Sequence, residues 1–169
     1  VAQTRRLAVT GLPWEIVSAA KLPGWSTRNG GDAKLGDEVA EFCDSALRSL
    51  DRFDESLTHL ALAAGRGVSV AELVWEASST GLRLAEMIPV GHTRLVVDDL
   101  GDLRILTSES PFEGIALPAD KFVVHAPQAI SGHVMRGGLL RVTALAYIAK
   151  RFAIKDWLIF AEVFGMPVR

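Results

Sequence analysis

Four histidines have the most versatile chemistry in this chain, because imidazole can bind a metal ion or move a proton near neutral pH. His59 lies in a helical pattern without a second ligand four residues further on, and His92 lies in a predicted turn. Zinc sites combine several His and Cys ligands at short spacings, and Cys43 is the only cysteine in the sequence. We therefore predict structural or surface roles for His59 and His92.

His125 and His133 form a stronger candidate pair. His125 ends a predicted strand just before Pro127, and His133 follows in the next loop after a glycine. The pair could bind a metal ion or a phosphate, but no aspartate or glutamate lies nearby to complete the site. A strand-end hydrogen bond that fixes the following loop is the simpler interpretation. An enzymatic hypothesis combines His125, His133 and Asp156, and it requires two of these side chains within hydrogen-bond reach in one pocket.

The remaining reactive groups have simpler structural interpretations. Cys43 falls on the apolar face of a predicted helix, where a buried thiol behaves as a small hydrophobic group. Asp98 and Asp99 are adjacent in a predicted hairpin turn, and the glycine pair at 30–31 lacks the flanking strand and helix of a phosphate loop. Arg136-Gly137-Gly138 precedes a helix whose free N–H groups could hold an anion, although a flexible start to the helix is the simpler interpretation. The sequence thus predicts no catalytic, cofactor-binding or metal-binding residue.

The composition is that of a globular protein. Hydrophobic residues make up 49% of the 169 residues, which argues against disorder, and one cysteine cannot form a disulfide scaffold. The 18 basic and 20 acidic residues nearly balance, so a strongly basic nucleic-acid binder is excluded by composition. No run of about 18 apolar residues predicts a membrane span, and the start lacks the apolar stretch of a signal peptide. We expect a soluble protein of cytoplasmic origin.

Both ends of the sequence suggest a piece of a longer protein. Residues 2–9 are typical of the end of a helix. At the other end, a helical pattern runs into Gly165-Met166-Pro167, and such a stop signal normally leads to a further element.

The first third of the chain is predicted to be mostly helical. Residues 12–17 alternate after a proline and predict a short strand, and the glycine-rich residues 22–36 predict a loop. Apolar residues spaced by three and four predict a helix over 37–53 and a second over 55–64, ended by Gly65-Arg66-Gly67.

The pattern then changes towards a period of two. Short apolar runs separated by turn residues predict strands at 70–75, 82–88, 94–97, 103–106, 112–117 and 121–125. Two helices are predicted at 138–152 and 155–164. The resulting fold class is α+β, with N-terminal helices, an antiparallel β-meander and then C-terminal helices, and not a parallel nucleotide-binding sheet.

Charge is distributed unevenly along the sequence. Residues 32–60 contain eight acidic and three basic residues, whereas residues 130–169 contain six basic and two acidic ones. An acidic end and a basic end could meet head to tail in a ring, or the basic end could face DNA. Ordinary solvated helix faces would give the same pattern.

The C-terminal third carries a specific resemblance. Its residues are Lys121-Phe122-Val123-Val124-His125, Arg136-Gly137-Gly138-Leu139-Leu140-Arg141, Lys155-Asp156-Trp157 and Phe164-Gly165-Met166-Pro167. Weaker matches lie upstream, at Pro13-Trp14-Glu15-Ile16 and around Val74-Trp75. In order and spacing the sequence resembles the portal proteins of Mu-like phages and prophages over almost its whole length.

This resemblance implies a structural role. Portal subunits form a ring, typically of twelve, at one capsid vertex, and double-stranded DNA passes through it during packaging and ejection. The implied partners are further copies of the chain, the DNA, terminase, head–tail connector proteins and the capsid protein, and the implied location is the virion, with assembly in the host cytoplasm. Residues 1–169 would be a wing-like core of a longer subunit, divided into 1–68 (strand plus helices), 69–126 (antiparallel strands) and 137–165 (helices).

Two alternatives from other classes remain open at this point. One is the small α+β enzyme that uses His125 and His133. The other is a DNA-binding module that uses the basic C-terminal helices, and it predicts tight, strongly salt-dependent binding to duplex DNA. The resemblance transfers no catalytic residue, cofactor or metal site to this sequence.

Overall fold

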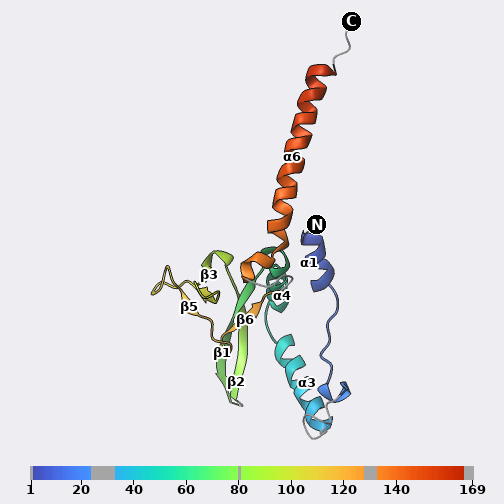
Figure 1. Cartoon of the computed structure of the whole chain (residues 1–169). Helices are drawn as coiled ribbons and strands as arrows, with labels where there is room; N and C mark the ends of the chain where they lie inside the picture. The colour runs from blue at the N-terminus through green and yellow to red at the C-terminus, as the bar shows by residue number, and fades with distance from the viewer. Residues whose placement is uncertain (1, 24–32, 80, 128–132, 166–169) are drawn as a thin grey trace.

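A computed structural model describes residues 2–23, 33–79, 81–127 and 133–165 (Figure 1). Helices lie at both ends of the chain, and two small antiparallel sheets lie between them. The predicted α+β class is therefore confirmed. The glycine pair at 30–31, most of the predicted loop at 22–36, and Met166-Pro167 fall outside the described residues.

The N-terminal part consists of helices and one extended segment. Helix α1 (Ala2–Thr10) is followed by an extended stretch and a short 3-10 helix, η1 (Ala19–Lys21). The predicted strand at 12–17 is wrong, because this extended stretch pairs with no other strand. Side-chain packing holds it instead. The Trp14 ring meets Phe53 edge to face at 5.4 Å between centroids, and the Arg48 guanidinium lies 4.7 Å from the Trp14 centroid.

Three further helices lead to the sheets. Helix α3 (Ala33–Arg48) begins four residues earlier and ends five residues earlier than predicted. The predicted second helix is in fact two, α4 (Phe53–Leu60) and α5 (Ala63–Arg66). Arg52 adopts a left-handed backbone at φ 60°, which turns the chain between α3 and α4. Gly67, at φ 97°, ends α5 where the sequence predicted a stop.

The first sheet has the order β2-β1-β6. Strands β1 (Ser69–Ser78) and β2 (Gly81–Val90) form a long hairpin in which Glu72 faces Ile88, with a bulge between Val74 and Trp75. Strand β6 (Phe122–His125) pairs antiparallel with the other edge of β1, where Glu72 also faces Phe122.

The second sheet contains the remaining strands in the order β3-β4-β5. These are β3 (Leu95–Val97), β4 (Leu103–Ile105) and β5 (Ile115–Ala116), and a 3-10 turn, η2 (His92–Arg94), precedes them. Each predicted strand between residues 70 and 125 exists, but a single meander is wrong. The last strand, β6, pairs with β1 and not with β5, and this pairing places Phe122 in the main core beside Val70.

Two clusters of buried side chains hold the helices and sheets together. The first joins both sheets and contains Val68, Val70, Val90, Leu95, Ile105 and Phe122. The second lies on the opposite face of β1, around Ala71 and Met87, and receives Leu50 from the helical part. Ser56 reinforces that contact by donating a 2.8 Å hydrogen bond to the Met87 carbonyl oxygen.

A single long helix follows a 3-10 turn, η3 (Val134–Gly137). Helix α6 (Leu139–Phe164) runs for 26 residues and projects away from the rest of the protein (Figure 1). The two separate helices predicted at 138–152 and 155–164 are wrong, because no glycine or proline interrupts the backbone hydrogen bonds between residues 152 and 155. The β1–β2 hairpin points the opposite way, and α3 lies on the other side of the body from the second sheet.

Candidate functional site

The two histidines of the enzymatic hypothesis make local hydrogen bonds. Nδ1 of His125 lies 2.8 Å from the carbonyl oxygen of Leu60, so the strand end is tied to helix α4. His133 precedes η3, and its Nδ1 accepts a 3.2 Å hydrogen bond from the backbone N–H of Met135. Asp156 lies on the exposed surface of α6. Among the described residues, no group of three His, Cys, Asp or Glu side chains is placed to hold a metal ion.

His59 and His92 are partly enclosed. Nε2 of His59 and Nδ1 of His92 are buried, and neither atom has a hydrogen-bond partner in the described part of the chain. Burial of the imidazole lowers the pKa of His92 below its usual value, and the positive charge of Arg66 lowers that pKa further. The predicted structural role fits these surroundings, since His92 lies where the second sheet begins.

The pKa of His92 predicts how stability depends on pH. Its folded-state pKa is below the unfolded value of about 6.5, so the unfolded chain binds the proton more readily. The free energy of unfolding should therefore decrease as pH falls from about 7.5 through 6.5 towards the lower folded pKa. Denaturant titrations should give a flatter pH profile for His92→Gln, and a profile as steep as that of wild type would contradict this assignment.

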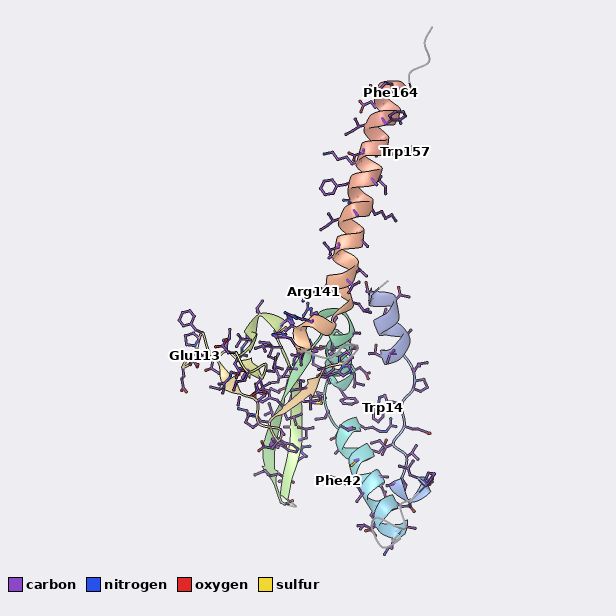
Figure 2. All side chains as sticks on the ribbon, viewed as in Figure 1. Trp14, Phe42, Glu113, Arg141, Trp157 and Phe164 are labelled. Atoms are coloured by element: carbon purple, nitrogen blue, oxygen red, sulfur yellow. The ribbon has the colours of Figure 1, made fainter. Side chains whose placement is uncertain are left out.

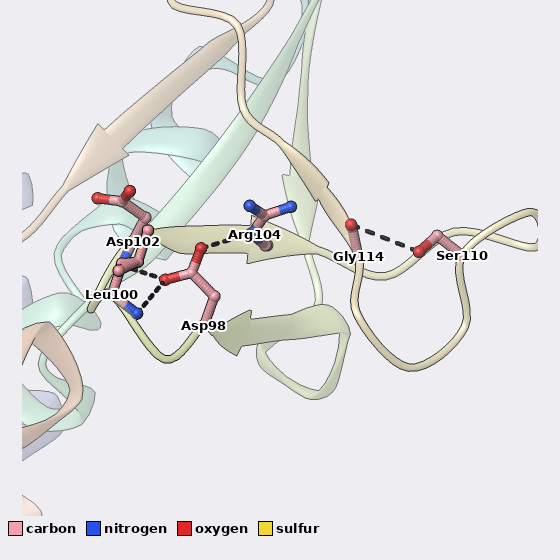
Figure 3. Close-up of polar contacts among 6 residues, drawn as sticks. All are labelled: Asp98, Leu100, Asp102, Arg104, Ser110 and Gly114. Atoms are coloured by element: carbon pink, nitrogen blue, oxygen red, sulfur yellow. Dashed lines mark hydrogen bonds and ion pairs between the residues drawn. The ribbon is translucent and has the colours of Figure 1, made fainter.

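Asp98 organises the turn between β3 and β4, as its turn-like sequence predicted (Figure 3). One carboxylate oxygen accepts hydrogen bonds from the backbone N–H groups of Leu100 (3.0 Å) and Asp102 (2.8 Å), and the other accepts one from Nε of Arg104 (2.7 Å). The Arg104 bond, followed by the Asp102 bond, lowers the pKa of Asp98. Gly101, at φ 93°, completes the turn.

Acid should weaken this turn. The folded-state pKa of Asp98 is depressed, so its contribution to stability is present above the unfolded pKa of about 4 and is lost as pH falls through the folded value. Asp98→Asn should have a lower melting temperature than wild type at pH 7, and the difference should shrink at about pH 2.5. If the difference in melting temperature stays constant with pH, Asp98 stabilises the turn through the geometry of its hydrogen bonds and not through its charge.

Helix α3 is less covered than its sequence predicted. Cys43 is half-buried, although the pattern placed it on a buried apolar face. On the same helix the Phe42 side chain is 70% exposed, and Val39 is also exposed. The most extensive contact of α3 is with η1, and its last turn also packs through Leu47 against the second core cluster and through Arg48 against Trp14.

Helix α6 is the largest uncovered feature. All 26 of its residues are exposed, and beyond its base its side chains project into open space (Figure 2). The exposed large hydrophobic side chains on α6 are Leu139, Leu140, Val142, Leu145, Tyr147, Ile148, Phe152, Ile154, Trp157, Leu158, Ile159, Phe160, Val163 and Phe164. Within the residues described, no helix is both long and apolar enough to cross a membrane. A continuous apolar surface of this kind marks an interaction site.

The base of α6 is packed tightly against α5. Gly138 is buried, and a Cβ atom there would lie 2.5 Å from the carbonyl oxygen of Gly65 and 2.8 Å from the nitrogen of Gly67. Leu140 packs beside Gly65. A glycine is needed at this position because Gly138 allows two backbones to approach closely, a contact that the interpretation of a flexible start did not include. The sequence placed glycines here, but the contact between them is visible only in the structure.

Known proteins are similar to this chain over its full length. The family described as the portal protein of Mu bacteriophage matches residues 1–169. The portal protein of Escherichia phage Mu is 24% identical over 172 residues, and the Mu-like prophage FluMu protein gp29 of Haemophilus influenzae is 28% identical over 172 residues. Each alignment covers 98% of this chain and 30% of the relative, so the chain spans about a third of their length. The chain belongs to the Mu bacteriophage portal protein family.

Proposed function

We propose that this chain is the wing-like core of a structural portal subunit from a Mu-like phage or prophage. Full-length subunits would form a ring of about twelve copies at one capsid vertex. Double-stranded DNA would pass through the ring during packaging and ejection, with terminase, head–tail connector proteins and the capsid protein as neighbours in the virion. Family membership over residues 1–169 supports this role, and the proposal includes no catalytic step.

The exposed surface of α6 is the observation that carries the assembly proposal. Fourteen large apolar side chains on one helix are exposed, and the most extensive contact of α6 with the body is with α5, at its base. Burying such side chains is favourable by roughly 25 cal/mol per Å² of apolar area, from which the entropy lost on association is subtracted. Further elements of the full-length subunit and neighbouring copies would cover this surface in the assembled ring.

The balance of charge suits a passage for DNA. The sequence has 18 basic and 20 acidic residues. A densely basic channel would hold phosphates tightly and would resist movement, because each neutralised phosphate strengthens binding at low salt. The nearly neutral charge of these 169 residues favours sliding of DNA over tight binding.

The mass of the full-length protein in solution tests the proposed assembly. Light scattering supported by particle images should give a closed ring of about twelve subunits with a central hole. A monomer or dimer that persists across salt and protein concentrations would overturn the ring proposal and leave the family relationship as common ancestry.

A second candidate is a DNA-binding module. Helix α6 has four basic residues, Arg141, Lys150, Arg151 and Lys155, and none of them forms a salt bridge among the residues that the structure describes. This candidate predicts duplex binding by the 169-residue chain that weakens steeply with salt. Binding that is absent or insensitive to salt would exclude it.

A further inference from the structure

The connection between β4 and β5 is an acidic loop that displays a large apolar side chain. We call this connection, residues 106–114, the acidic tip. It contains Glu109 and Glu113, and Arg104 is the only basic residue between positions 95 and 117. Phe112 is 86% exposed. Neither glutamate forms a salt bridge within the described chain.

Hydrogen bonds hold the acidic tip in a fixed shape. The connection at 106–114 has its own set of bonds, at the other end of β4 from the Asp98 turn (Figure 3). The Ser110 N–H donates to Oγ1 of Thr107 (3.1 Å), and the Ser110 hydroxyl lies 3.4 Å from the carbonyl oxygen of Gly114. Gly114, at φ 68°, lies so close to Ile105 that a Cβ atom would be 2.8 Å from its carbonyl oxygen. Phe112 is therefore displayed on an ordered loop, and docking would require little loss of conformational entropy.

Helix α6 has a face of complementary character. Arg141, Leu145, Ile148, Arg151 and Lys155 are spaced by four, three, three and four residues, so they lie along one side of the helix. We call these five residues the basic face of α6. All are exposed, and its three cations form no salt bridge in the part of the chain described. The basic face thus offers apolar and positively charged groups where the acidic tip offers apolar and negatively charged ones.

We propose that the acidic tip of one subunit docks on the basic face of α6 of a second copy. The two surfaces differ in structure and lie on different elements, so the contact is heterologous and can be repeated from copy to copy around a ring. Carboxylates opposite guanidinium and ammonium groups give the contact its orientation, and the exposed Phe112 supplies apolar area. This inference rests on the proposed ring assembly, and it names the surfaces that meet.

Charge reversal in the full-length subunit tests this contact. The tip variant, Glu109→Lys with Glu113→Lys, and the helix variant, Arg151→Glu with Lys155→Glu, should each raise the concentration for half-assembly at least about tenfold, because like charges then face each other. Combining all four substitutions should restore assembly close to wild type. The matched control, Asp37→Lys with Glu41→Lys, makes the same charge change on the exposed surface of α3 and should assemble normally.

A cysteine pair gives an independent measurement. In a Cys43→Ser background, Phe112→Cys combined with Ile148→Cys should form disulfides between subunits under mild oxidation, while each single variant should not form the ladder of linked subunits. Leu82→Cys combined with Ile148→Cys is the control, since Leu82 is also highly exposed, at the far end of the β1–β2 hairpin.

The outcomes separate this inference from the proposed function. Rings that form normally in both reversal variants, without Phe112–Ile148 cross-links, would overturn the contact and leave the ring proposal standing. Reversal variants that both impair assembly but do not rescue each other would also overturn it, as would a helix variant that loses only DNA retention. A wild-type protein that stays monomeric would overturn both the ring and the contact.

Discussion

The Gly138→Ala variant is expected to unfold about 6–12 °C below wild type. A methyl group at this position would meet the Gly65 carbonyl oxygen at 2.5 Å, the Arg66 carbonyl carbon at 2.6 Å and the Gly67 nitrogen at 2.8 Å. All three are backbone atoms, so α5 and α6 must separate to admit the methyl group. Overpacking against a rigid backbone costs about 3 kcal/mol of unfolding free energy.

Gly137→Ala is the matched control for this prediction. Its new methyl group would lie 3.4 Å from the Pro127 carbonyl oxygen, which is an ordinary van der Waals distance. The change in unfolding free energy should therefore stay within about 0.5 kcal/mol. Thermal melts followed by circular dichroism measure both variants. Equal melting temperatures for Gly138→Ala and wild type would show that α6 does not depend on this close contact.

Ile105→Ala should produce the second large effect. Ile105 is 2% exposed and belongs to the cluster that joins the two sheets. Removing most of a buried isoleucine side chain costs about 2–5 kcal/mol, because the transfer free energy is lost and a cavity remains. Since β4 provides this anchor, the loss should also speed hydrogen exchange over residues 95–117 more than in the first sheet.

Ile115→Ala is the control that distinguishes two causes of lost stability, the removal of a buried side chain and the replacement of a β-branched residue in a strand. Ile115 pairs with Ile105 across the same sheet but is 46% exposed, so its truncation should cost about 1 kcal/mol or less. Chemical denaturation measures both free energies, and hydrogen exchange reports where the loss occurs. A similar loss in the two variants would mean that Ile105 is not the anchor of the second sheet.

Local patterns were sufficient to locate most of the elements. The alternating runs between residues 70 and 125 predicted all six strands, because the runs are rich in apolar residues and turn residues separate them. Pairing was harder to predict, since Phe122 faces Glu72 across fifty residues of sequence. The alternation at 12–17 predicted a strand that has no partner, because a period of two describes a backbone shape and does not provide a neighbour.

The exposed surface of α6 and the close contact at its base were harder to predict than the strands, because sequence patterns do not contain the contacts that determine them. The apolar residues of α6 predicted helices that would normally be buried, yet every residue of α6 is exposed. Periodicity shows which side of a helix is apolar but not which molecule covers it. The resemblance carried by residues such as Lys155-Asp156-Trp157 identified the family, which matches the entire chain. The close approach of Gly138 to Gly65 required the three-dimensional arrangement of α5 and α6.

The contact at Gly138 sets the angle at which α6 leaves the body, and the length of α6 amplifies any change in that angle. A helix of 26 residues is about 39 Å long at a rise of 1.5 Å per residue, so each degree of rotation at its base moves its far end by about 0.7 Å. Small errors in the angle between α5 and α6 would therefore be magnified at Phe164. Glycines that bring two backbones into direct contact leave little freedom in the angle between α5 and α6. In a much larger assembly, the position of the far end of α6 would therefore depend on this small contact.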